Sequence, residues 1–159
     1  MKAFLKSFFY AYVGLLAALK HERNLRIHYI IALVMLWVCW WIGVSTTQLM
    51  VVVIIINVVI SFELINTALE AAVDLVTKEY RALAKIAKDT AAAAVLFSAI
   101  IAIGIGILVL YEPLNQYWLY KHRNEVPLTE QLVILGMISF LVFTFSHAMW
   151  SKFKQNKQK

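Results

Sequence analysis

The sequence has few helix-breaking residues, few charges and almost no cysteine. Of its 159 residues, only two are proline, five are glycine and 15% are charged, whereas 62% are hydrophobic. This composition excludes a soluble globular protein and predicts an all-α protein that crosses a membrane several times. The only cysteine, Cys39, excludes a disulfide framework, and because it lies among apolar residues we expect a buried free thiol.

Several motifs of soluble enzymes are also missing. The sequence contains no GxxxxGK[ST] loop, no kinase-type GxGxxG, no Cys and His set with zinc spacing, and no Ser or Cys nucleophile beside a base. No small-residue cleavage site precedes the charged KHERN cluster, so we expect no removable signal peptide. The net charge of +6 does not indicate nucleic-acid binding, because the basic residues flank apolar stretches.

Apolar stretches separated by polar residues predict four membrane-spanning helices. We place them at residues 27–43, 48–76, 90–110 and 131–150. The pattern of large apolar residues in residues 3–20 predicts an amphipathic surface helix. An outer loop is expected at 111–129, bounded by two prolines.

The basic residues give the expected orientation of these spans. Thirteen of the fifteen Lys and Arg residues fall on one side of the membrane, and only Lys121 and Arg123 fall on the other. By the positive-inside rule, both termini and the 77–89 loop lie in the cytoplasm.

The most informative stretch is residues 61–76, where polar side chains interrupt an apolar span. Glu63, Asn66, Glu70 and Asp74 are spaced by three, four and four residues, which puts them within about 80° on one helix face. Acids inside a span are costly and usually mark a functional site. Glu63 should lie about 9 Å inside the cytoplasmic boundary, while Glu70 and Asp74 reach water. This gradient suits a reaction between a lipid-soluble acceptor and a water-soluble donor.

The charged segment KEYRALAKIAKD predicts an anion site at the start of the third span. We expect Asp89 or Thr90 to cap that helix. Its N-terminal amides and dipole favour an anion, and Lys85 and Lys88 reinforce the positive end. Taken alone, lysines near a cytoplasmic boundary more often reflect topology than catalysis.

These residue types support phosphoryl transfer. Mg²⁺ prefers carboxylate oxygens and keeps phosphate ligands, so Glu70 and Glu22 are suited to hold a metal–nucleotide complex. Glu63 is deeper and less solvated, which suits a general base that accepts a proton from a lipid hydroxyl. Mg²⁺, Lys88 and the N-terminus of the third span would neutralise phosphate charge.

Three segments of the sequence carry a resemblance to a known family: KHERNLRIH, SFELINTALEAAVDLVTKEY and LAKIAKDTAAAAV. They closely resemble the small prokaryotic integral-membrane diacylglycerol kinases, especially the Gram-positive undecaprenol kinase branch. The resemblance implies a lipid kinase domain at 1–110 with a surface helix and three spans. Residues 130–159 add a fourth span and a basic cytoplasmic tail. The resemblance also implies a homotrimer in the bacterial cell membrane that uses Mg-ATP. Its active sites would be shared between subunits and face the cytoplasm.

The resemblance assigns site residues by motif position. Glu63 becomes the catalytic base, which also contacts the substrate, and Asn66 supports it. Glu22 and Glu70 match the metal-binding carboxylates, and Trp41 falls at a lipid-side position. The positions around the nucleotide are Tyr10, Glu79, Tyr80, Arg81, Lys88 and Asp89.

Two positions depart from the family pattern. Ala3 stands where a basic residue is expected, so Lys2 or Lys6 must substitute for it. His28 occupies a site that is acidic in the diacylglycerol-preferring enzymes, which favours a polyprenol acceptor. We therefore expect an undecaprenol kinase that makes undecaprenyl phosphate. The nearest alternative is a diacylglycerol kinase that makes phosphatidic acid.

Two other classes of protein stay open. A row of acids in a membrane can form a proton or cation relay, but residues 49–60 of this span carry only Asn57 as a polar group. A non-catalytic subunit is the other class, with the fourth span as its docking element. Apart from the resemblance, association of subunits would shield the acidic face from lipid.

Overall fold

The computed structural model describes residues 2–120 and 128–156, and the elements in these ranges are helices. They are α1 (Lys2–His21), α2 (Arg23–Ile42), α3 (Thr46–Val76), α4 (Ala82–Tyr120) and α5 (Leu128–Asn156). Each of the last four is long and apolar enough to cross a membrane. The predicted all-α, multi-pass membrane protein is confirmed. Residues 121–127 of the expected outer loop and the side chains of Lys2 and Ala3 lie outside the described residues.

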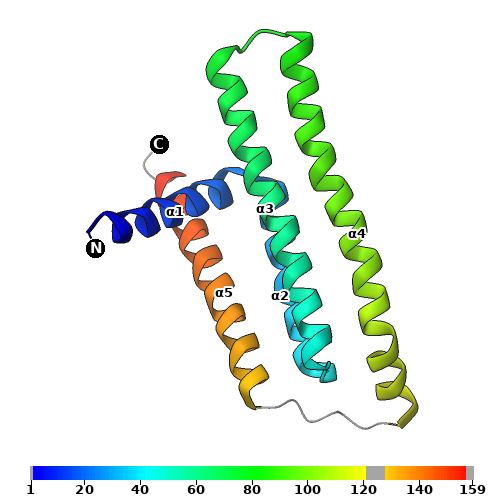
Figure 1. Ribbon diagram of the computed structural model, residues 1–159. Coiled ribbons are helices and arrows are strands. Elements are labelled where there is room, and N and C mark those ends of the chain that lie inside the picture. Colours follow the sequence, from blue (N-terminus) through cyan, green and yellow to red (C-terminus); the bar gives the residue numbers. More distant parts are fainter. Residues whose placement is uncertain (1, 121–127, 157–159) are drawn as a thin grey trace.

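The helix α1 crosses the bundle, whereas the other helices run alongside one another (Figure 1). Its Phe4, Phe8 and Phe9 side chains are exposed. The placement of α1 in the head-group layer stays a prediction. The antiparallel pair α3 and α4 continues well past α1 (Figure 1). We call the side of the bundle where α1 lies the α1 side, and the opposite side the far side.

A tight turn on the far side joins α2 to α3. Gly43 ends α2 with a positive φ of 77°, a conformation that favours glycine. Ser45 begins α3 through a capping box in which the Ser45 amide donates to Gln48 Oε1 at 2.8 Å. From there α3 runs for 31 residues, and the predicted continuation through Val76 is confirmed. The length of this helix places its polar face on the α1 side.

The helix α4 begins earlier than predicted. The prediction put its start near residue 90, but it begins at Ala82, so the connection after α3 is reduced to residues 77–81. The segment from Ala82 is rich in strong helix formers, and Lys85 pairs with Asp89 one turn later. Asp89 and Thr90 therefore lie inside the helix, and the predicted cap at these residues is wrong.

The helix α4 also ends later than predicted, because it passes through Pro113. A proline inside a helix removes the hydrogen bond to the carbonyl four residues earlier, which is that of Val109. In this structure Gln48 Nε2 of α3 donates to the Val109 carbonyl oxygen at 3.2 Å. A side chain from a neighbouring helix thus replaces the missing donor, and residues 111–120 are helical instead of forming part of an outer loop.

Candidate active site

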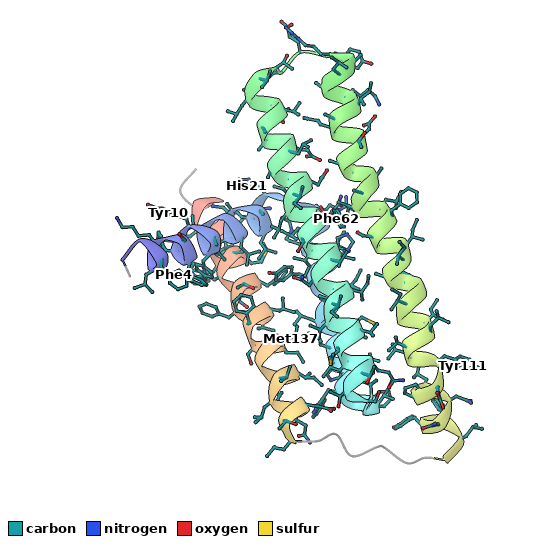
Figure 2. The ribbon with its side chains drawn as sticks, in the orientation of Figure 1. Phe4, Tyr10, His21, Phe62, Tyr111 and Met137 are labelled. Atoms are coloured by element: carbon teal, nitrogen blue, oxygen red, sulfur yellow. The ribbon has the colours of Figure 1, made fainter. Side chains whose placement is uncertain are left out.

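The polar face predicted on α3 is present, and its exposure rises toward the end of the helix. Glu63 and Asn66 are buried, with 2% and 8% of their surface exposed. Glu70 is half-buried and Asp74 is exposed. Phe62, the neighbour of Glu63, lies near the level of α1 (Figure 2). The face therefore runs from the packed bundle into the part of α3 that extends past α1.

The polar groups on this face contact different partners from those expected. Asn66 Nδ2 donates to Glu70 Oε1 at 2.8 Å. Asn66 therefore orients Glu70, the expected metal ligand, and not Glu63, the expected base. Glu63 Oε1 instead lies 3.3 Å from His28 Nε2 on α2. The sequence signalled His28 only through its departure from the family pattern. Its proximity to Glu63 depends on how α2 and α3 pack, which no local spacing reveals.

A groove of about 630 Å³ lies between α1, the junction of α1 and α2 at Glu22, and α3. Glu22, Glu70 and Asp74 all line it, together with His21 of α1. Glu22 precedes the first residue of α2, and its side chain makes no capping hydrogen bond. The two predicted metal ligands, Glu22 and Glu70, are therefore brought to one groove from separate parts of the chain.

The donors in this groove fit a magnesium ion that also binds phosphate. In residues 2–120 and 128–156, no group of three His, Cys, Asp or Glu side chains is close enough to hold a metal ion alone. Mg²⁺, however, usually takes one or two protein carboxylates and completes its shell with phosphate and water. Glu22 and Glu70 supply two hard oxygen donors of this kind.

The residues predicted around the nucleotide fall into separate groups. Tyr10 lies on α1, and its side chain is exposed (Figure 2). Glu79, Tyr80 and Arg81 lie in the exposed connection between α3 and α4, about 10 Å or more beyond Glu70 along the α3 axis. Between these groups, Lys88 of α4 contacts Asp74 of α3, with 2.5 Å between Nζ and Oδ1. A single chain does not bring all of them to the groove.

A second groove, of about 520 Å³, lies between α2, α3 and α4 and is almost entirely apolar. It begins at His28 and includes Tyr111, which lies toward the far end of α4 (Figure 2). The α4 residues that line it extend from Ala99 to Leu114, a length of about 22 Å along the helix. Because His28 also contacts Glu63, one end of this apolar groove lies beside the buried carboxylate.

Trp41 is not near this carboxylate. It stacks on Trp37, with 5.9 Å between ring centroids, and lies 4.9 Å from the ring of Tyr117. Trp41 follows His28 by thirteen residues on α2, which places it about 20 Å away along the helix axis. Its predicted role on the lipid side could therefore involve only the distant part of a lipid chain, and it stays a prediction.

Comparison with known proteins agrees with the geometry. Residues 9–110 match the family described as prokaryotic diacylglycerol kinase. The chain is 38% identical over 109 residues to an undecaprenol kinase of Bacillus subtilis, which covers 69% of this chain and 89% of that protein. It is 40% identical over 111 residues to a diacylglycerol kinase of Synechocystis, covering 69% of this chain and 63% of that protein. A diacylglycerol kinase of Escherichia coli is 30% identical over 102 residues, covering 64% and 84%. No solved structure matches the chain.

Proposed function

Because the chain belongs to the prokaryotic diacylglycerol kinase family and is a membrane lipid kinase, we propose that it transfers the γ-phosphoryl group of Mg-ATP to undecaprenol. The relatives that it resembles include kinases named for both undecaprenol and diacylglycerol, at similar identity. The choice of acceptor therefore rests on the site itself.

The observation that carries this choice is the apolar groove that leads to Glu63. In its described lining, only His28 and Tyr111 have polar side chains. Diacylglycerol would bring two ester groups to this groove, and a carbonyl left without a donor costs roughly 1–3 kcal/mol. A polyprenol has one polar group, its terminal hydroxyl, which can lie at the His28 and Glu63 end. The isoprenoid chain would fill the apolar remainder.

The proposed reaction uses the two grooves together. Glu63 accepts the proton of the lipid hydroxyl as the oxygen attacks the γ-phosphorus, and His28 lies beside it, with 3.3 Å between its Nε2 atom and Glu63 Oε1. A P–O bond forms to the lipid, the bond to the leaving β-phosphate oxygen breaks, and ADP departs. Glu22 and Glu70 would hold Mg²⁺, which neutralises charge on the phosphates when bound. Asn66 keeps Glu70 oriented toward this role.

The proposal includes a homotrimer with shared sites on the cytoplasmic side of a bacterial cell membrane. The basic side chains around the 77–81 connection favour that orientation. The distance between this connection and the Glu22 and Glu70 groove supports sharing. A nucleotide that needs both sets of residues would draw them from neighbouring chains.

Acceptor profiling tests the proposed function. Purified protein in liposomes would receive radiolabelled ATP, Mg²⁺ and either undecaprenol or diacylglycerol at equal mole fraction. We expect kcat/KM to be at least about tenfold higher for undecaprenol. Equal or faster phosphorylation of diacylglycerol would overturn the acceptor assignment. Proton flux without ATP turnover would instead favour a proton relay. The absence of both lipid phosphorylation and proton flux would favour a non-catalytic subunit.

A further inference from the structure

The helix α5 lies outside the stretch that matches the family, which ends at residue 110. It nevertheless packs along α2 and against α1. Its buried residues are Glu130, Ile134, Leu141, Thr144 and Ala148, and the half-buried Met137 and Ser151 extend their spacing of four and three. On α2 the buried residues also lie three or four apart: Leu25, Tyr29, Ala32, Leu36, Cys39 and Ile42. This spacing is typical of helices that pack side by side over their full length.

Three specific contacts fix α5, one on the far side of the bundle and two on the α1 side. On the far side, the Thr46 hydroxyl at the start of α3 donates to the buried carboxylate of Glu130. On the α1 side, the side chains of Tyr29 on α2 and Thr144 on α5 are hydrogen-bonded, and both are almost fully buried. Hydrogen bonds between membrane helices set which faces meet. The register of α5 on α2 is therefore defined and does not depend on apolar contact alone.

The third contact joins α5 to α1. The ring centroids of Tyr12 on α1 and His147 on α5 lie 6.2 Å apart. Ala148, which follows His147 in sequence, is fully buried. The helix α1 packs more extensively against α5 than against α2 or α3. Figure 1 shows the end of α5 reaching α1 where α1 crosses the bundle. Most of the packing that holds α1 in place thus comes from the added span.

The same helix α1 forms one wall of the groove that contains Glu22 and Glu70. The α1 residues in this wall are Ala11, Gly14, Leu15, Ala17, Ala18 and His21. Four of these six are Gly or Ala, whose short side chains offer little area to attach α1 to α3. The position of this wall therefore depends on the contacts that α1 makes with helices other than α3.

We propose that α5 is an internal brace that fixes α1 across the bundle and thereby sets the shape of the Glu22 and Glu70 groove. Thr144, His147 and Ala148 are positioning residues for the bound nucleotide, which they do not touch. The fourth span is then neither an accessory element nor a site for a separate partner. The kinetic part of the test rests on the proposed function, whereas the structural part does not.

The kinetic test enlarges Ala148, the fully buried residue that follows His147 on α5. Ala148→Leu should push α1 away, because inserting methylene groups into a packed contact displaces its neighbours. We expect the KM for Mg-ATP to rise about tenfold, with kcat and the acceptor KM changed less than twofold. Ser146→Leu, at an exposed position of the same helix, is the matched control and should leave all three values unchanged. The proposed role of α5 would be overturned if Ala148→Leu impaired the KM for Mg-ATP, kcat and the acceptor KM to the same degree, or if it changed none of them.

The structural test needs no catalysis. In a Cys39→Ala background, the pair Tyr12→Cys and His147→Cys should be joined by a short bismaleimide in the resting protein. The control pair Tyr10→Cys and His147→Cys should not be joined, because Tyr10 is exposed and lies on the opposite face of α1, about 160° around the helix from Tyr12. Mg-ATP binding should survive the Tyr12 cross-link. Failure to cross-link, or loss of nucleotide binding in the linked protein, would contradict a fixed contact between α1 and α5.

Discussion

At the scale of single residues, Glu63 combines burial with one close partner, His28, and these features separate its role from that of Glu70. Replacing Glu63 by Gln keeps the shape of the side chain and removes its ability to accept a proton. We expect kcat to fall by about 10²–10⁴-fold, while Mg-ATP binding measured by calorimetry changes little. The matched control is Glu112→Gln, on the exposed surface of α4 near the far side. Substantial turnover by Glu63→Gln would refute its role as the base.

Two glycines of α4 offer a paired test of the apolar groove. Gly106 lines the groove, and a Cβ atom there would lie 3.6 Å from Met35 Cε. Gly104 is exposed, and a Cβ atom at that position would meet nothing within 4 Å. Gly106→Leu should therefore occupy space that the lipid chain needs and raise the acceptor KM about tenfold. Gly104→Leu should leave it unchanged. Equal acceptor KM values in the two variants would exclude this groove as the lipid site.

At the scale of elements, the passage of α4 through Pro113 depends on Gln48 of α3. Gln48→Met should destabilise the protein by about 1–2 kcal/mol, because the Val109 carbonyl loses its donor and the Ser45 amide loses its acceptor in the capping box. Pro113→Ala supplies a backbone N–H to the same carbonyl, so the cost of Gln48→Met should be smaller in that background. Denaturation of the four proteins in detergent gives this double-mutant cycle. Purely additive changes would mean that Gln48 does not compensate for the proline.

The elements that the sequence predicted well are those with local causes. The course of α3 follows from a long apolar stretch without Pro or Gly, and its polar face follows from helical spacing alone. The end of α4 depends on Gln48, which lies 61 residues away in sequence from Val109. The His28 contact with Glu63 likewise joins two helices. Sequence spacing describes one helix at a time, and these two features exist only once helices pack.

At the scale of the whole molecule, shared sites predict complementation between subunits. An Arg81→Met chain would lack one residue of the expected nucleotide set, and a Glu63→Gln chain would lack the base. If a site takes these residues from different chains, mixed assemblies contain some sites with both residues intact. Co-reconstitution should therefore yield lipid kinase activity well above the sum of the two variants measured alone. Activity equal to that sum would mean that each chain builds its own site.

The turn between α2 and α3 also has a consequence for how the chain enters a membrane. Residues 43–45 connect the two helices, and none of them carries an ionisable side chain. The capping box already pairs the Ser45 amide within the turn, so few polar groups there need water. Moving this turn through hydrocarbon requires no charge to be stripped of water. The first two spans can therefore cross the hydrocarbon layer together as a closed hairpin.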